Sequence, residues 1–319
     1  EIYTDAGKTI FESVVLNPTY FEWKKCYTYI HGFFDTQRKI DIQYLENIFD
    51  IPLGPSQEEL FKLIYSIETY YSIILRIIAH KAIFGSIQYT KEVFEDKIYI
   101  AKGILNYSCV NYYNWFFDLS RAEGLVKDVY DAVNLEDVEI EGDAISTIFE
   151  YIFPKVLRHS VGEYYTPYWL ANTVIDQLII NDESAPSKKY IDPACGSATF
   201  LVALINKFRT LSNNAIFSNI CGIDINPLTV LAAKTNFLIL YNKYCNLTSE
   251  NPIEIPIYCA DTIAINDTPI LLTEKNNYDN VPCIKYDYIV GNPPWVNWEY
   301  MPEKYRIQHA QLWQYYGLF

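Results

Sequence analysis

Residues 190–200 read YIDPACGSATF. A short apolar run ends at Asp192 and gives way to a turn of small residues, after which a helical pattern begins. Small residues such as Ala194 and Gly196 let a ligand approach the backbone of the turn, and the first amides of the following helix attract a carboxylate. Asp192 is suited to pair with an ammonium group. The stretch therefore predicts a strand, a tight turn and a helix that together bind the zwitterionic end of an amino acid.

Three further apolar runs repeat this pattern. We predict four strands, at Tyr190–Pro193, Ile220–Ile225, Ile255–Cys259 and Tyr286–Val290, with helical patterns after the first two. Alternating strands and helices require right-handed crossovers, which produce a parallel, doubly wound sheet of the α/β class. Ligands of such sheets bind beyond the carboxyl ends of the strands. The informative motifs of this chain lie at those predicted ends.

Two more aspartates follow predicted strands. GIDINP at residues 222–227 places Asp224 where doubly wound folds bind ribose hydroxyls, and the neighbouring Ile225 is suited to pack on an adenine ring. Asp261, after the third strand, is suited to accept a hydrogen bond from an adenine amino group. An amino-acid end, a ribose and an adenine together describe S-adenosylmethionine (S-adenosyl-L-methionine). A dinucleotide is the alternative, but the chain has no GxGxxG motif and no evident second half-site.

The fourth predicted strand leads into Asn292-Pro293-Pro294-Trp295. The Asn292 amide oxygen and the Pro293 carbonyl can accept hydrogen bonds from one NH2 group and direct its lone pair toward a methyl donor. Orientation of this kind supplies about 7–11 kcal/mol of a barrier, more than a single general base usually supplies. Trp295 offers a face for an extracted base, and such stacking is worth roughly 1–3 kcal/mol. The alternative is that Asn292-Pro293-Pro294-Trp295 is an ordinary turn after a strand. The three motifs that precede it in the expected order make this alternative less favoured.

The front half of the chain has a different character. Apolar residues occupy nearly every helical face from Glu58 to Phe84, and Glu92–Leu119 is also mostly helical. The acidic stretch Leu135–Asp143 predicts a linker. We therefore expect a helical domain at residues 1–143 and a ligand-binding domain at residues 144–319.

The second domain begins with more helix. A helical pattern from Ala144 to Arg158 is bent near Pro154 and leads to GEYYTP at residues 162–167. Thr166 is suited to cap the next helix, and Pro167 fits the first turn of that helix because its missing N–H costs nothing there. This helix is expected to end near Ile180.

Composition and charge narrow the classes of protein. Of the 319 residues, 50% are apolar and 20% are charged, which is typical of a globular chain. The run Leu60–Phe84 is interrupted by charged residues and predicts a buried helix rather than a membrane span. No secretion signal precedes it, so we expect a cytoplasmic protein. The seven cysteines form no CxxC pair and predict no metal site or disulfide framework. The net charge of -14 and the lack of a basic run mean that much of any grip on DNA must come from elsewhere.

Taken in order, the motifs resemble those of N6-adenine DNA methyltransferases, as arranged in modification subunits of type I restriction-modification systems and in fused type II enzymes. GEYYTP is similar to motif ten of that family, followed by DPACGS (motif one), GIDINP (two), ADT (three) and NPPW (four). The match covers Lys155–Trp298. The resemblance implies that the methionine end of the cofactor lies beside Tyr164, Tyr165, Thr166 and Pro167, and that the motif-one turn contributes Asp192, Ala194, Gly196 and Phe200. It implies that the ribose and adenine are bound by Asp224, Ile225 and Asp261. The target base would be held by Asn292, Pro293, Pro294 and Trp295.

The resemblance implies a Rossmann-like, S-adenosylmethionine-dependent methyltransferase domain that acts on a flipped adenine in DNA. It also implies a target-recognition region, either later in the same chain or on a specificity subunit. Ala198 replaces the glycine common in motif one, and Trp295 replaces the commoner tyrosine or phenylalanine. The family's sheet has three more strands, so we expect the sequence ending at Phe319 to be part of a longer protein, with the fourth strand as an unpaired edge.

Other functions stay open on the sequence alone. The same motif four serves amino groups of RNA or of a protein glutamine, and a scaffold without turnover is a further alternative. Glu22-Trp23-Lys24, with Asp5 upstream, is a bare E-x-K triplet of the kind found in nucleases, but we interpret it as surface charge on a helix or loop. The histidines are isolated and are interpreted as structural or solvated: His31, His80, His159 and His309. The aromatic cluster Tyr112–Phe117 is interpreted as core or domain interface.

Overall fold

The computed structural model describes most of the chain. The described residues are 2–14, 18–31, 41–54, 56–86, 90–108, 112–135, 144–161, 165–209, 215–245, 247–264, 281, 284–294, 301 and 303–317. The predicted linker lies almost entirely outside them, so the domain boundary near Asp143 stays a prediction.

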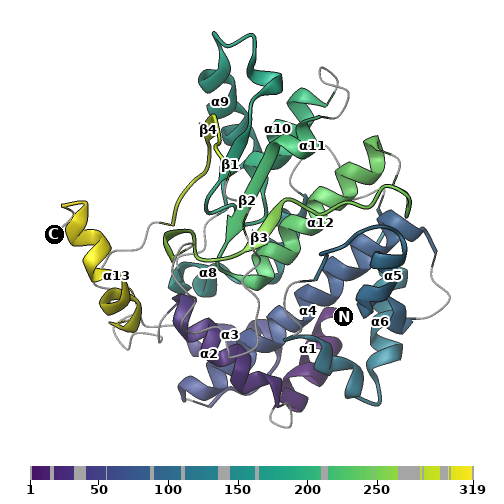
Figure 1. The fold of residues 1–319 in the computed structure, drawn as a ribbon. Coiled ribbons are helices and arrows are strands. Elements are labelled where there is room, and N and C mark those ends of the chain that lie inside the picture. Colours follow the sequence, from purple (N-terminus) through teal and green to yellow (C-terminus); the bar gives the residue numbers. More distant parts are fainter. Residues whose placement is uncertain are drawn as a thin grey trace.

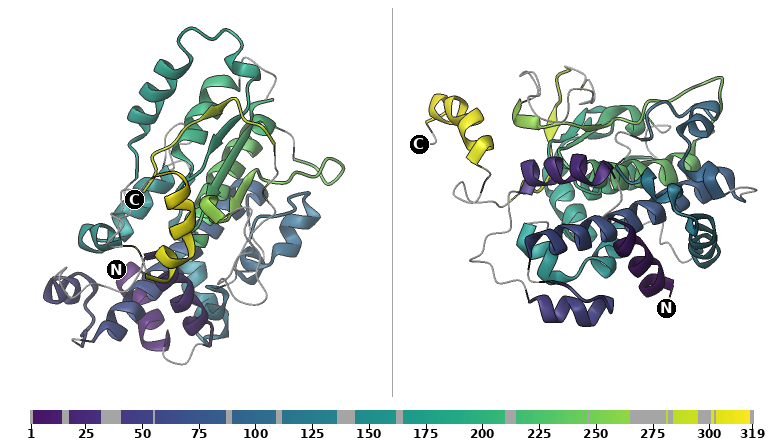
Figure 2. Two further views of the ribbon diagram at one scale, coloured as in Figure 1. Left: turned by 60° about the vertical axis from the view of Figure 1, so that its left-hand side comes forward. Right: turned by 90° about the horizontal axis from the view of Figure 1, so that it is seen from below.

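The N-terminal part is helical, as predicted, but the stretch Glu92–Leu119 is divided into short helical pieces with non-helical residues between them. Its elements are α1 (Ile2–Ser13), α2 (Thr19–His31), α3 (Ile42–Phe49), α4 (Gln57–Phe84), α5 (Asp96–Ala101) and α6 (Ala122–Ala132), with short 3-10 turns η2 (Thr90–Phe94) and η3 (Asn114–Asp118). These helices gather at one end of the molecule, drawn in purple and blue in Figures 1 and 2.

Helix α4 is the central element of this part. It begins at the N-cap Ser56, whose side chain accepts a hydrogen bond from the Glu59 backbone N–H. Nearly every residue from Leu60 to His80 is buried, because α1 and α12 (Pro227–Tyr244) pack on it from different sides. The predicted buried helix is therefore confirmed. Among the described residues, no helix combines the length and apolarity needed to cross a bilayer.

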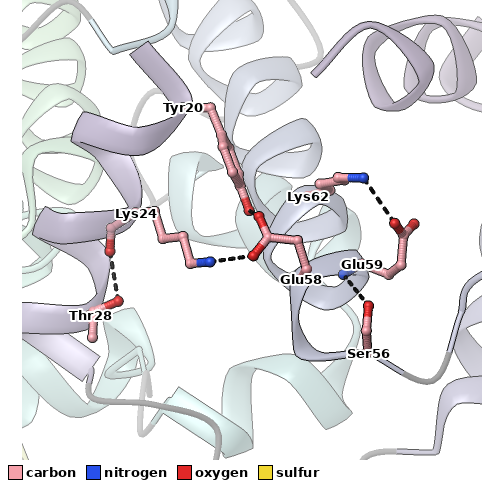
Figure 3. Close-up of polar contacts among 7 residues, drawn as sticks. All are labelled: Tyr20, Lys24, Thr28, Ser56, Glu58, Glu59 and Lys62. Atoms are coloured by element: carbon pink, nitrogen blue, oxygen red, sulfur yellow. Dashed lines mark hydrogen bonds and ion pairs between the residues drawn. The ribbon is translucent and has the colours of Figure 1, made fainter. Parts of the chain in front are cut away.

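Polar contacts join α2 to α4. Tyr20 donates a 2.6 Å hydrogen bond to Glu58, and Lys24 pairs with the same carboxylate, as Figure 3 shows. Trp23 is buried and donates to Glu68 over 2.6 Å. The E-x-K triplet lies on a helix, as predicted, but it is not simply surface charge: Trp23 is buried and Lys24 pairs with Glu58, so both residues hold α2 against α4.

The second part of the chain combines helices with a small parallel sheet. The helices are α7 (Ala144–Ile152), α8 (Lys155–Val161), α9 (Tyr168–Ile179), α10 (Thr199–Phe208), α11 (Ile216–Asn219), α12 and α13 (Glu303–Tyr315), with 3-10 turns η4 (Ala185–Ser187) and η5 (Thr262–Ala264). The predicted bend near Pro154 is a break between α7 and α8.

The strands are β1 (Tyr190–Asp192), β2 (Ile220–Asp224), β3 (Ile257–Cys259) and β4 (Tyr288–Ile289). They form one sheet of order β3-β2-β1-β4 in which every pairing is parallel (Figure 1). The four predicted strands and their parallel arrangement are confirmed. Because the strands are parallel, their carboxyl ends meet at one edge of the sheet. Among the described residues β4 is an outer strand of this sheet, and its Ile289 is 74% exposed.

The helical part and the sheet share one apolar core. It runs from Ile10 on α1 to Val290 beyond β4. Polar contacts reinforce this junction: the fully buried Lys234 of α12 donates to the Asn106 carbonyl over 2.6 Å, and the Asn106 side chain bonds the backbone N–H and C=O of Ile255. The N-terminal part of the chain is therefore hydrogen-bonded to α12 and to the segment that precedes β3.

Candidate functional site

The turn after β1 is tied to the end of β2. Asp192 is almost fully buried, and its Oδ1 accepts a hydrogen bond from the Ala194 N–H at 3.1 Å. Gly196 takes a positive φ of 53° and donates its N–H to Asp224 Oδ2 at 2.9 Å. Glycine is the residue that adopts such a φ without strain. The first two motifs thus form one hydrogen-bonded unit.

Motif four lies directly beside motif one. Strand β4 pairs with β1, and Val290 donates its N–H to the Ile191 carbonyl at 2.9 Å. A Cβ atom placed on Gly291 would lie 2.5 Å from Asp192 Oδ1, closer than real Cβ contacts allow. The backbone before Asn292 therefore runs against the Asp192 carboxylate, at neighbouring strand ends.

Asn292 also contacts motif ten. Its Nδ2 donates to the Thr166 hydroxyl at 3.2 Å. The prediction that Thr166 caps the next helix is wrong: the N-cap of α9 is Pro167, without a side-chain cap, and the helix begins at Tyr168. The Thr166 hydroxyl is used instead as a partner for the side chain of Asn292, 126 residues away.

Asp224 holds its own turn together. Besides Gly196, it accepts hydrogen bonds at 2.9 Å from the Asn226 N–H and from the Thr229 hydroxyl. Burial raises the pKa of this carboxyl, and the hydrogen bonds oppose the rise. The side chain stays partly exposed, as does Ile225 next to it.

Asp261 follows β3 and is 7% exposed. Its Oδ1 accepts a hydrogen bond from the Ile263 N–H at 3.0 Å, and the neighbouring Thr262 hydroxyl donates to the Pro193 carbonyl at 2.5 Å. The end of β3 is thereby joined to the turn after β1. His309 of α13 lies near Asp261, with 3.6 Å between Nε2 and Oδ2. The sequence offered no sign of this contact.

The electrostatics favour a cationic ligand. Burial raises the pKa of Asp192 from 3.8 to about 7; the Ala194 N–H lowers it and the nearby Asp224 charge raises it further. Among the residues that the structure describes, no positive charge lowers the pKa of this carboxyl. A cation bound at this edge of the sheet would supply that charge.

The motif-one turn also carries backbone strain. Ala198, at the N-cap of α10, has a φ of 73° in the left-handed region. For a residue with a Cβ atom this conformation costs roughly 1–2 kcal/mol. The neighbouring Ser197 is fixed by its hydroxyl contact with Ser146 at 2.7 Å and by the Asn236 side chain, which donates to its carbonyl at 2.9 Å. These contacts explain how alanine is held where glycine would be relaxed.

The remaining predicted site residues differ in their surroundings. Tyr165 packs on Phe149, with ring centroids 4.7 Å apart, and its ring would lie 3.9 Å from a Cβ atom placed on Gly196. Phe200 is buried on α10 within the core, whereas Pro293 and Pro294 are exposed. Tyr164 and Trp295 lie outside the described residues.

Comparison with known proteins places the chain in a family. The model of the N-6 DNA Methylase family matches residues 140–318, more than half of the chain. The chain belongs to this family. The resemblance to N6-adenine DNA methyltransferases is thereby confirmed.

Two curated relatives share this family part. The type I restriction enzyme MjaVII methylase subunit of Methanocaldococcus jannaschii is 29% identical over 178 residues, which cover 54% of this chain and 25% of the relative. The MjaIX methylase subunit of the same organism is 26% identical over 173 residues, covering 53% and 26%. The chain thus spans about a quarter of the length of the curated relatives it matches.

Among solved structures, the type I restriction-modification methyltransferase subunit of Streptococcus thermophilus aligns with 92% of this chain and 63% of its own. The sequence identity is 15% and the TM-score is 0.36. Membership of the family therefore stands on the sequence match over residues 140–318.

The close approach of Gly291 to Asp192 generates a prediction. In Gly291→Ala the added methyl collides with the carboxylate, so we expect a loss of about 1–3 kcal/mol in the free energy of unfolding, measured by urea denaturation. Gly124→Ala is the matched control. A Cβ atom on Gly124, inside α6, meets nothing within 4 Å, so this variant should be about 0.5–1 kcal/mol more stable than the unchanged protein. Equal stability of the two variants would contradict the close approach of β4 to Asp192.

Proposed function

We propose that this chain is the catalytic part of an N6-adenine DNA methyltransferase of a restriction-modification system. The reaction moves a methyl group from S-adenosylmethionine to the exocyclic amino group of an adenine in DNA. The observation that carries the proposal is the close approach of Gly291, the residue before Asn292, to Asp192 at the ends of the paired strands β4 and β1. A side chain suited to hold an amino group and a buried carboxylate suited to a cationic donor thus lie at one edge of the sheet.

The residues present fit S-adenosylmethionine. Bound there, the cofactor supplies an electrophilic methyl group on a positively charged sulfur. The turn after β1 would hold its methionine end, with Asp192 facing the ammonium group. Asp224, partly exposed, would hold the ribose, and Asp261 the adenine amino group. The raised pKa of Asp192 supports this assignment because a bound cation would stabilise the ionised carboxyl that burial disfavours.

The target amino group would be held by Asn292 and Pro293. Two acceptors at fixed positions orient the amine, and orientation lowers the barrier without a separate general base. Thr166 contacts the Asn292 amide and so acts as a positioning residue for it. Trp295 is proposed to stack on the flipped base. This reassigns Thr166, which the family resemblance places beside the cofactor.

The proposal also covers the division of the chain into domains and the source of its binding to DNA. We propose a Rossmann-like, doubly wound domain at residues 144–319 behind a helical domain at 1–143. The net charge of -14 is unfavourable for phosphate binding, so we propose that a specificity subunit or target-recognition region supplies most of the grip on DNA. Both curated relatives are described as methylase subunits of type I restriction enzymes, which supports a partner of this kind.

Methyl transfer tests the function directly. Full-length protein, with its partner subunit, is incubated with labelled S-adenosylmethionine and mixed-sequence DNA, and methyladenine is quantified. We expect Asn292→Ala to reduce methyladenine about 100-fold or more, because the amine loses its orientation. Gln177→Ala, at an exposed position of α9, should leave the rate unchanged. Label that enters RNA or a protein glutamine instead of DNA would reject the DNA acceptor.

The hydrogen bond between Thr166 and Asn292 makes a separate prediction. Thr166→Val keeps the shape of the side chain but removes the hydroxyl, so kcat should fall up to about tenfold while the Kd for S-adenosylmethionine stays the same. Thr166→Ser retains the hydroxyl and should restore kcat. A weaker Kd with unchanged kcat would show that Thr166 contacts the cofactor rather than Asn292.

The raised pKa of Asp192 predicts a pH dependence of cofactor binding. Its carboxyl is protonated in the free protein below about pH 7, and a cationic ligand requires the ionised form. Affinity for S-adenosylmethionine, measured by calorimetry between about pH 5.5 and 7.5, should therefore rise with pH and level off above about 7. Asp192→Asn should bind weakly and lose most of this slope; a slope that persists in this variant would exclude Asp192 as the source.

A further inference from the structure

Two tyrosine side chains and one histidine side chain lie around Asp261. Tyr305 and His309 come from α13, and Tyr29 comes from α2; together with Asp261 we call them the Asp261 cluster. The Tyr305 hydroxyl donates to Asp261 Oδ1 at 3.4 Å, and His309 Nε2 lies 3.6 Å from Oδ2. The rings of Tyr305 and His309 are 4.3 Å apart, and those of Tyr305 and Tyr29 are 5.7 Å apart.

The cluster joins α13 to the end of β3. This helix lies at the periphery of the molecule, drawn in yellow in Figure 1. On this helix Ile307 is 70% and Tyr315 is 82% exposed, whereas His309 is 2% exposed. His309 is the buried residue of α13, and it places the helix in polar contact with Asp261.

The two oxygens of Asp261 are in different states. Oδ1 already accepts from the Ile263 N–H and the Tyr305 hydroxyl. Oδ2 is buried and, like His309 Nε2, has no hydrogen-bond partner among the described residues. At 3.6 Å the pair is just beyond hydrogen-bonding distance, so the contact is weaker than a regular hydrogen bond. Exchanging His309 for a group that donates a regular hydrogen bond to Oδ2 would therefore lower the free energy of this buried acceptor.

Burial of Tyr29, followed by the charge of Asp261, raises the pKa of this tyrosine to about 12. Tyr29 therefore stays a neutral phenol and adds no charge that would repel Asp261. The N-terminal helical part thus forms one wall of the cluster, and α13 is seated between that wall and the end of β3.

We propose that α13 is a latch on the adenine end of the cofactor site. This inference rests on the proposed function, in which Asp261 holds the adenine amino group. While α13 is seated, His309 covers Asp261 Oδ2, and the adenine amino group reaches that oxygen only after His309 has withdrawn. Seating of α13 and binding of the cofactor adenine therefore exclude each other.

Competition of this kind lowers the apparent affinity for the cofactor. The apparent Kd equals the intrinsic Kd divided by the fraction of molecules in which the latch is open. Helix α13 begins 11 residues after Asn292 in the sequence, so its release is also linked through the chain to the proposed target-base site. Filling the cofactor site would thereby release α13 from Asp261.

Calorimetry of S-adenosylmethionine binding to the full-length protein tests the latch. We compare the unchanged protein with His309→Ala, Tyr305→Phe and the double variant. Each substitution removes a polar group through which α13 holds Asp261, so binding should become tighter, by up to about tenfold for each substitution. Gln311→Ala, an exposed position on the same helix, is the control and should bind like the unchanged protein.

Limited trypsin digestion gives a second readout. Lys304 and Arg306 lie in the first turns of α13. Cleavage at these residues should be faster in His309→Ala than in Gln311→Ala, and S-adenosylmethionine should accelerate it in the unchanged protein. Tyr305→Phe, which keeps its ring, provides the comparison should His309→Ala lower the melting temperature.

The outcomes separate this inference from the proposed function. Unchanged or weaker binding by His309→Ala and Tyr305→Phe, with normal binding by the unchanged protein, would overturn the latch while leaving the methyltransferase assignment intact. Binding by the variants alone would be the strongest support, because the latch would then be closed in nearly all molecules. Failure of every form to bind would reject both the cofactor assignment and the latch.

Discussion

The parallel pairing of β4 with β1 is the interaction on which the candidate site depends. It brings the backbone at Gly291 against the buried Asp192 carboxylate, with no space for a Cβ atom between them. Two motifs separated by about a hundred residues thereby share one edge of the sheet. Without this register, Asn292 would have no fixed relation to the turn after β1, and the proposed methyl transfer would lack its geometry.

The edge is held by many hydrogen bonds between neighbouring motifs rather than by any one of them. Asp224 binds the Gly196 N–H, and Thr262 binds the Pro193 carbonyl, so the ends of β2 and β3 both support the turn after β1. Behind the turn, Ser146 and Asn236 hold Ser197. This redundancy explains how the turn tolerates a buried, partly neutral carboxyl and a left-handed alanine within a few residues of each other, each of which costs stability.

The elements of the sheet were predictable to within about two residues, because each strand is a short apolar run bounded by turn residues. The helical N-terminal part and the break at Pro154 were predictable for similar local reasons. The role of Thr166 was not: capping and bonding to Asn292 use the same hydroxyl, and the choice between them depends on a residue far along the chain. His309 was missed because a histidine on an exposed helix carries no sign of its partner.

The sequence by itself determined the local units and their chemistry: strand, small-residue turn and helix, with an aspartate or asparagine at each strand end. Hydrophobic period, glycine and proline act over a few residues, so such units are legible without coordinates. Only the tertiary structure decided which strand ends are neighbours, that Asn292 meets Thr166 and that α13 lies on Asp261. Those relations depend on strand register and on packing between distant segments, where the interaction energy is shared by residues that no local pattern connects.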